Sequence, residues 1–266
     1  MRDDNVRAKG FTLFVRLFAS APRPLLFAAV IAFAAAFFAA RFSDMPGADI
    51  GSFVSTFLIA APSFWALWRA LGTRAFAFTV VTLTVFAYGI ETTGVATGYP
   101  YGPFYYGDAL GPRAFGLVPY LLPVSYLPLV LGAVAAAWRP SVRLAPWVIG
   151  ATLVLVIMDG VLDPGAAAMG FWVWPTGGIY FGVPLSNFAG WLLSGALATA
   201  LLLGVSRWPL TRAPPPGMID SMTIATAFWV GADIFAGLWF PALIGVALFL
   251  FLLERRRALQ AARTAA

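Results

Sequence analysis

Acidic side chains inside apolar segments are the residues of this sequence best suited to chemistry. Asp159 and Asp163 stand four residues apart in "IMDGVLDPG", so they share one face if that segment is helical. Glu91 ends another apolar run, "FAYGIE". Ionisable groups inside a membrane segment are costly and are usually functional or paired. Two neighbouring carboxyl groups repel each other when both are ionised, so the pair favours retaining a proton and predicts a proton donor.

Three further polar residues accompany these acids. Asp108 lies in the aromatic stretch "GYPYGPFYYGDALGP" (98–112), Asn187 in "PLSNFAGW" and Asp233 in a later apolar run. Each has a structural alternative, because Asp108 can cap its turn, Asn187 can cap a helix or hold a water, and Asp233 can bridge helices. Arg113 is a candidate ion-pair partner for any of the acids.

Two aromatic stretches share a spacing. "YPYGPFYYG" (99–107) and "WPTGGIYFG" (174–182) align Pro100 with Pro175, Gly102 with Gly177, Tyr105 with Tyr180 and Gly107 with Gly182. An aromatic belt at the membrane interface explains the Trp and Tyr residues singly, whereas it does not explain a repeated spacing beside acids. The repeat predicts two related helical hairpins packed around a shared site.

Composition excludes several kinds of chemistry. The 266 residues include no His and no Cys, 61% are hydrophobic and 11% are charged, and the mean hydropathy is +0.86, all typical of an integral membrane protein. Thiolate chemistry and histidine bases are therefore absent. The acids are too sparse for an aspartate-rich magnesium diphosphate site, and no glycine-rich phosphate loop is present. We expect neither a metal nor a cofactor.

Apolar runs between charges predict an all-α, polytopic transmembrane bundle of about eight spans with two long aromatic, Gly- and Pro-rich outer loops. The expected spans are 24–40, 50–68, 75–91, 117–138, 146–163, 186–205, 220–237 and 239–253. Pro164 is expected to end the fifth span directly after Asp163. We treat 1–266 as one membrane domain, with a basic, amphipathic N-terminal segment (1–23, helical over 6–18), core hairpins over 75–205 and a Pro-rich inner linker at 213–217.

Charge distribution predicts the orientation. Of the 17 Lys and Arg residues, all but Arg41 and Arg113 fall on one side of the predicted spans. The positive-inside rule then places both termini in the cytoplasm of a bacterial or archaeal cell, with the aromatic loops on the outer face of its membrane. The net charge of +6 is explained by these helix-end residues, so it does not indicate nucleic acid. A cleaved signal peptide is the alternative for the first span.

Protonation of an alkene suits this set of residues. A buried acid gives a proton to a trisubstituted double bond, aromatic faces stabilise the tertiary cation, and a water held by a carboxylate captures it. We predict Asp163 as the acid, with Glu91 or Asp159 orienting the water.

Two blocks carry a family resemblance. "ETTGVATGYPYGPFYYGDALGP" and "MDGVLDPGAAAMGFWVWPTGGIYFGVPLSNFAGW" resemble the membrane-type carotenoid 1,2-hydratase family (bisanhydrobacterioruberin hydratase-like carotenoid biosynthesis proteins). The resemblance implies addition of water to the terminal double bond of an acyclic ψ-end carotenoid, such as lycopene or γ-carotene. Tyr101 departs from the phenylalanine more usual there. The polar positions of the pattern are Glu91, Asp108, Asp163 and Asn187, and its aromatic positions are Tyr105, Tyr106, Trp172, Trp174, Tyr180 and Trp191.

Other functions remain open at this point. A small membrane-type carotenoid end-group cyclase begins with the same protonation but closes a ring instead of adding water. A carotenoid-binding or transport subunit would do no chemistry and would tolerate loss of Glu91 and Asp163. The expected partner is a carotenoid in the bilayer, with other carotenoid-pathway enzymes as further candidates.

Overall fold

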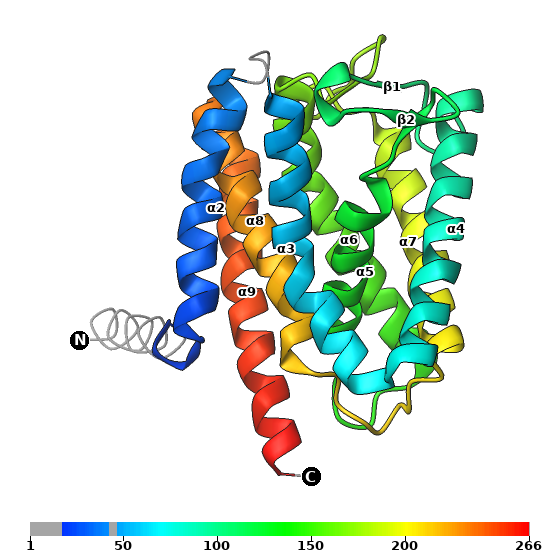
Figure 1. Ribbon diagram of the computed structural model, residues 1–266, viewed down its shortest axis with the longest axis vertical. Helices are drawn as coiled ribbons and strands as arrows, with labels where there is room; N and C mark the ends of the chain where they lie inside the picture. Colours follow the sequence, from blue (N-terminus) through cyan, green and yellow to red (C-terminus); the bar gives the residue numbers. More distant parts are fainter. Residues whose placement is uncertain (1–17, 43–46, 266) are drawn as a thin grey trace.

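Helices make up nearly all regular structure in the computed structural model, which describes residues 18–42 and 47–265 (Figure 1). Of the predicted N-terminal amphipathic helix (6–18), only Phe18 falls within these residues. The α-helices of the described part are α2 (Arg23–Phe42), α3 (Ala48–Leu71), α4 (Thr73–Thr97), α5 (Leu122–Ala137), α6 (Leu144–Ala168), α7 (Leu185–Ser206), α8 (Asp220–Phe235) and α9 (Trp239–Thr264).

The predicted all-α polytopic bundle is confirmed. Six helical segments in the described residues are long and apolar enough to cross a membrane, namely α2, most of α3, α4, α6, α7, and α8 with the short helix that precedes it. The α5 helix is apolar but has only 16 residues, and α9 carries charges from Glu254 onward. The exact number of crossings therefore stays a prediction.

The α6 helix corrects the expected helix end at Pro164. It continues to Ala168 with Pro164 inside it. Proline has no N–H to donate to the carbonyl four residues earlier, which leaves the Gly160 oxygen without its helical partner. The Tyr180 hydroxyl donates to that oxygen at 2.9 Å. A side chain from the following loop thus replaces the missing backbone hydrogen bond, so the helix carries Asp163 in its interior rather than at a broken end.

Helices α4, α5, α6 and α7 pack around one another, and α8 lies between them and α2. The long buried face of α5 includes Leu127, Leu131 and Val134, and it forms the core with Trp147 and Leu155 of α6. These contacts pack the helices of the predicted core hairpins (75–205) against one another, and the assignment of the hairpins as a catalytic core stays a prediction. The predicted Pro-rich linker leads into a short 3-10 helix, η2 (Pro216–Ile219), which packs against α3 and α5.

The two ends of the bundle differ in chemistry. The aromatic loops lie at one end, while α2 begins and the chain ends at the opposite end (Figure 1). At that opposite end, Arg139 and Arg255 donate to the carbonyl oxygens of Ala136 and Trp138, where α5 terminates. Arginine at a helix C-terminus satisfies carbonyls that have no helical partner. The assignment of this end to the cytoplasm stays a prediction.

The aromatic loops are joined by a short antiparallel sheet. Strand β1 (Tyr105–Tyr106) pairs with β4 (Trp172–Val173), with Tyr106 opposite Trp172. The Gly107 N–H adds a bond to the Phe171 oxygen at 2.8 Å, and a Cβ at Gly107 would collide with the Gly170 oxygen. Within the first loop, a 3-10 helix, η1 (Asp108–Leu110), is followed by the paired strands β2 (Arg113–Ala114) and β3 (Val118–Pro119).

The repeated spacing corresponds only in part to repeated structure. Gly102 and Gly177 both have positive φ, at 88° and 63°. Gly107 and Gly182 differ, since φ is −73° at the first and 88° at the second. The shared spacing therefore reflects similar turn chemistry at one position, and the two loops play different parts around the site.

Candidate active site

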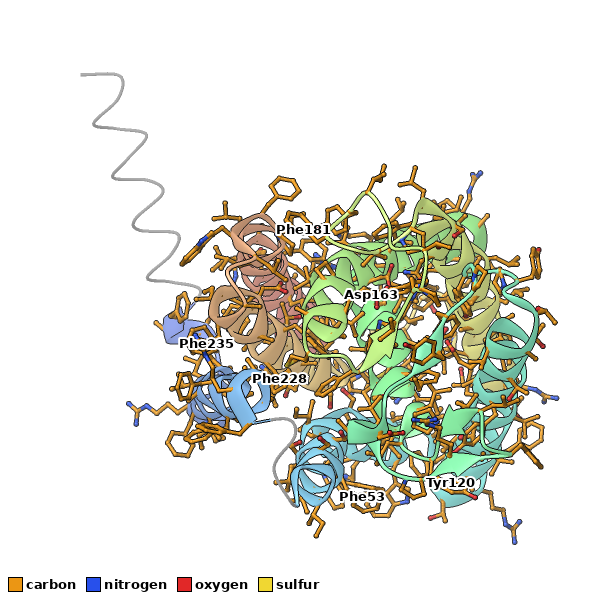
Figure 2. The ribbon with its side chains drawn as sticks, turned by 90° about the horizontal axis from the view of Figure 1, so that it is seen from above. Phe53, Tyr120, Asp163, Phe181, Phe228 and Phe235 are labelled. Atoms are coloured by element: carbon orange, nitrogen blue, oxygen red, sulfur yellow. The ribbon has the colours of Figure 1, made fainter. Side chains whose placement is uncertain are left out.

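A cavity of about 440 Å³ lies between the helices, beneath the joined loops. Glu91 of α4, Asp163 of α6 and Asn187 of α7 line it, so three helices bring their polar residues to one space. Seen from above, Asp163 lies in the interior of the bundle (Figure 2). Most of the remaining wall is aromatic and aliphatic. Such a cavity is suited to an apolar ligand whose reactive end meets a few polar groups.

Asn187 holds the two aspartates of α6 together. Its side-chain Nδ2 donates to both oxygens of Asp159, at 3.0 and 3.3 Å, and to Oδ2 of Asp163. All three side chains are buried. Asp163 reaches the cavity, whereas Asp159 is not among the residues that line it. The predicted pair on one helix face is thus one cavity-facing carboxyl supported by a second behind it.

Glu91 is the second acid at the cavity. Its Oε2 accepts a hydrogen bond from the Tyr106 hydroxyl at 2.9 Å. Burial and the nearby Glu91 carboxyl raise the pKa of Tyr106 well above its usual value, so the phenol stays protonated and acts as a donor. Glu91 and Asp163 line the same cavity. Two acids from different helices therefore face the same apolar space.

Tyr101 lies at the centre of the site and is 3% exposed. Its ring passes between two helices at glycines. A Cβ on Gly94 of α4 would lie 2.7 Å from the ring, and a Cβ on Gly190 of α7 would be closer still. Burial, followed by the Glu91 carboxyl, raises the pKa of Tyr101 above its usual value, so it too keeps its proton. Glycine at these two positions is what admits a tyrosine here.

Aromatic rings surround the acids. Tyr106 packs edge-on against Trp172, with centroids 6.0 Å apart, and Trp172 lies 6.3 Å from Trp229 of α8. On other sides, Phe104 packs against Trp174 at 6.2 Å, and Tyr126 against Trp191 at 5.7 Å. Aromatic rings that present a π face to this space can stabilise a cation formed there.

Two polar atoms of this wall have no hydrogen-bond partner among the described residues. These are the Tyr126 hydroxyl and the Trp174 indole N–H. Buried polar groups are normally paired, with protein or with ordered water. Both side chains line the cavity, so a water molecule bound near the acids has donors available to it.

The predicted site residues fall into two groups, those that line the cavity and those that lie away from it. Those that line the cavity are Glu91, Asp163, Asn187, Tyr106, Trp172, Trp174 and Trp191. Asp108 lies on the exposed loop surface, where it pairs with Arg113 at 2.6 Å. Tyr105 is 51% exposed, and Tyr180 bonds the Gly160 carbonyl instead of facing the cavity. Burial and then Asp233 raise the pKa of Tyr180 to about 12.

Asp233 lies apart from the cavity wall. It is fully buried in α8, and its oxygens have no hydrogen-bond partner in the described part of the chain. Gly165 of α6 faces it, since a Cβ there would lie 2.9 Å from Asp233 Oδ1. No three acidic side chains in the described ranges are grouped so that they could hold a metal ion.

Sequence reasoning missed several wall residues, including Tyr126 and Trp229. Phe104 was also missed, although it stands inside the quoted aromatic motif between Tyr101 and Tyr105, which was a usable signal. Trp229 comes from an apolar helix far along the chain, and no local pattern marks it. Only the packing of α8 against α6 brings it to the site.

Comparison with known proteins identifies the family of the chain. The family model described as "Carotenoid biosynthesis protein" matches residues 50–252. The chain is 41% identical over 208 residues to a bisanhydrobacterioruberin hydratase from Haloarcula japonica, covering 73% of this chain and 69% of that relative. No solved structure matches the chain. The matched region contains the three helices that carry Glu91, Asp163 and Asn187, and the chain belongs to the carotenoid biosynthesis protein family.

Proposed function

We propose that this protein adds water across the terminal double bond at an acyclic ψ end of a carotenoid, leaving a tertiary hydroxyl. The observation that carries the proposal is the placement of Asp163 and Glu91, from different helices, on one apolar, aromatic cavity. The name of the Haloarcula japonica relative, a hydratase, supports the same reaction class. Lycopene, γ-carotene and related precursors all carry the required end group.

The first step is transfer of a proton from the Asp163 carboxyl to the less substituted carbon of the terminal double bond. The two electrons of the π bond form the new C–H bond, and a tertiary carbocation is left at the neighbouring carbon. Asn187 fixes the orientation of the Asp163 carboxyl through its amide. The surrounding rings stabilise the cation without reacting with it.

Water then captures the cation. Its oxygen forms the new C–O bond, and one of its protons passes to a carboxylate, for which Glu91 is the candidate across the cavity. The Tyr106 hydroxyl holds Glu91 in place. A proton exchange between the acids and solvent restores Asp163, so the reaction consumes one water and needs no oxidant or reductant.

The test is expression in a bacterial host that accumulates lycopene, followed by mass spectrometry of the extracted pigments. We expect products heavier by one or two waters. An isomer of unchanged mass would instead identify a cyclase. The same test is repeated in hosts that accumulate γ-carotene or longer acyclic carotenoids. If the protein is well inserted and leaves every one of these pigments unchanged, hydration is refuted and a binding subunit remains.

A further inference from the structure

The cavity opens toward the side of the bundle between α2 and α3. Its wall includes Ala35 and Ala39 of α2, and Ser52 and Ser55 of α3, side chains that are neither fully buried nor fully exposed. Phe38 and Phe42 also line it, although they are 63% and 45% exposed. Side chains that border both the cavity and the outer surface mark an opening.

Packing explains why an opening forms at this place. Helix α2 packs along α8, whereas α3 packs against α5, η2 and α8, and the described parts of α2 and α3 make little direct contact. Near its middle, α3 is fastened to α8. The Ser63 N–H donates to Ser221 Oγ at 3.0 Å, and Ser221 Oγ donates to the Ala60 oxygen at 3.1 Å. The opening therefore lies between these hydrogen bonds and the end of the bundle that carries the aromatic loops.

Many side chains that border the opening are small, and their hydroxyl groups are largely hydrogen-bonded. Alanines of α2 face the part of α3 that contains Gly51, Ser52 and Ser55. The Ser55 hydroxyl donates to the Ser52 oxygen at 3.2 Å, and Thr56 donates to the same oxygen at 2.6 Å. Because these hydroxyls are bonded within the helix, an apolar chain can pass without stripping them of water.

Aromatic side chains connect the opening to the acids. Phe228 of α8 lies between α2 and α3 in the view from above (Figure 2). Its ring packs edge-on against Trp229 at 5.1 Å, Trp229 lies 6.3 Å from Trp172, and Trp172 contacts Tyr106. Tyr106 in turn bonds Glu91. A continuous aromatic wall thus runs from the side of the bundle to the reacting groups.

Size decides what occupies this path. A cavity of about 440 Å³ is in the range that encloses a drug-sized ligand, which is shorter than a carotenoid. Resting on the proposed function for the identity of the ligand, we infer that the α2–α3 opening is the lateral entrance for the carotenoid. The reacting end group lies at Asp163 and Glu91, and the rest of the polyene lies along Phe228 and between α2 and α3, continuous with the lipid.

The test uses the absence of cysteine from the chain, because one introduced thiol is then the only one. Ser55→Cys places the thiol in the opening. Val54→Cys is the matched control, since Val54 neighbours it on the same helix, is 50% exposed and does not line the cavity. Each purified variant is assayed before and after complete labelling with benzyl methanethiosulfonate. Carotenoid uptake from lycopene-loaded liposomes and hydration rate are measured separately.

We expect labelling of Ser55→Cys to reduce uptake and hydration at least about tenfold relative to the same variant unlabelled. Overpacking costs about 1–3 kcal/mol, and about 1.4 kcal/mol corresponds to a tenfold change in an equilibrium constant. Labelled Val54→Cys should match its unlabelled form. Unchanged uptake by fully labelled Ser55→Cys would overturn the entrance. If Ser55→Cys does not fold, Ala39→Cys tests the opposite wall with the same criterion. Normal uptake without any hydrate in the parent would refute hydration but still test the entrance. No uptake by the parent of lycopene, γ-carotene or a longer acyclic carotenoid would overturn both.

Discussion

Asn187 offers the sharpest test of how the acids are organised. Its amide is the donor shared by Asp159 and Asp163, and all three side chains are buried. Asn187→Leu keeps a similar volume but removes both N–H donors. The substitution leaves two buried carboxyl groups without this partner, and it frees Asp163 to change its orientation in the cavity.

The size of the effect follows from the two partners. A hydrogen bond contributes about 1.5–3 kcal/mol with a charged partner and about 0.5–1.5 kcal/mol with a neutral one, so the lower values for one ionised and one protonated carboxyl group give about 2 kcal/mol. Protein stabilities are about 5–15 kcal/mol, so the variant should still fold. A misplaced reacting group can reduce a rate about 100-fold. We therefore expect a large loss of hydration in a protein that remains folded.

The assay compares Asn187→Leu with the parent in two measurements: the free energy of unfolding from SDS titration in mixed micelles, and the initial rate of hydrate formation. Leu185→Ala, an exposed substitution in the same first turn of α7, is the control and should change stability by less than about 0.5 kcal/mol. A parent-like hydration rate in Asn187→Leu would refute the role of Asn187 in positioning Asp163. An unchanged free energy of unfolding would refute the estimate of its hydrogen bonds.

Four further substitutions, one of them a control, test the assignment of other residues. Asp163→Asn should lower the hydration rate by about 10²–10⁴-fold through loss of the acid, whereas Asp108→Asn on the loop surface should leave it near the parent value; equal losses would remove the distinction between them. Gly190→Ala should displace the Tyr101 ring, and we expect it to lower the free energy of unfolding by about 1–3 kcal/mol and to reduce the hydration rate. An unaffected thermal midpoint and hydration rate would contradict the close packing of this ring. Tyr180→Phe should cost about 0.5–1.5 kcal/mol in an unfolding titration by removing the donor to a helix carbonyl, with hydration retained, and a complete loss of hydration would place Tyr180 at the reaction.

Much of the fold could be predicted because long apolar runs separated by charges are a direct consequence of burying helices in lipid. Helix ends were predicted less well. Glu91 was expected at the end of a span, yet α4 continues to Thr97, since nothing in "TTGVAT" prevents further helical hydrogen bonds. Pro164 was expected to end a helix, but the hydroxyl of Tyr180 supports the carbonyl that proline leaves unpaired. That support comes from a residue distant in sequence, so local propensity could not reveal it.

The candidate site could likewise be predicted in part from the sequence. Asp159 and Asp163 could be paired from their spacing alone, because two residues four apart share a helix face. The bridging amide of Asn187 depends on how α7 packs against α6, which the spacing does not contain. The aromatic motif marked the right loop but did not distinguish Tyr106, which bonds Glu91, from the exposed Tyr105. In adjacent residues of a strand, side chains point to opposite faces, and only the pairing with β4 determines which one faces the site.

The most direct test of hydration by acid catalysis is isotope incorporation by the purified protein. The reaction is run on an acyclic carotenoid once in heavy water and once in water labelled with ¹⁸O. Proton transfer followed by water capture predicts one non-exchangeable deuterium on the carbon next to the one that bears the new hydroxyl. It also predicts a hydroxyl oxygen derived from water. A hydroxyl oxygen derived from dioxygen, or a product without that deuterium, would contradict the proposed reaction.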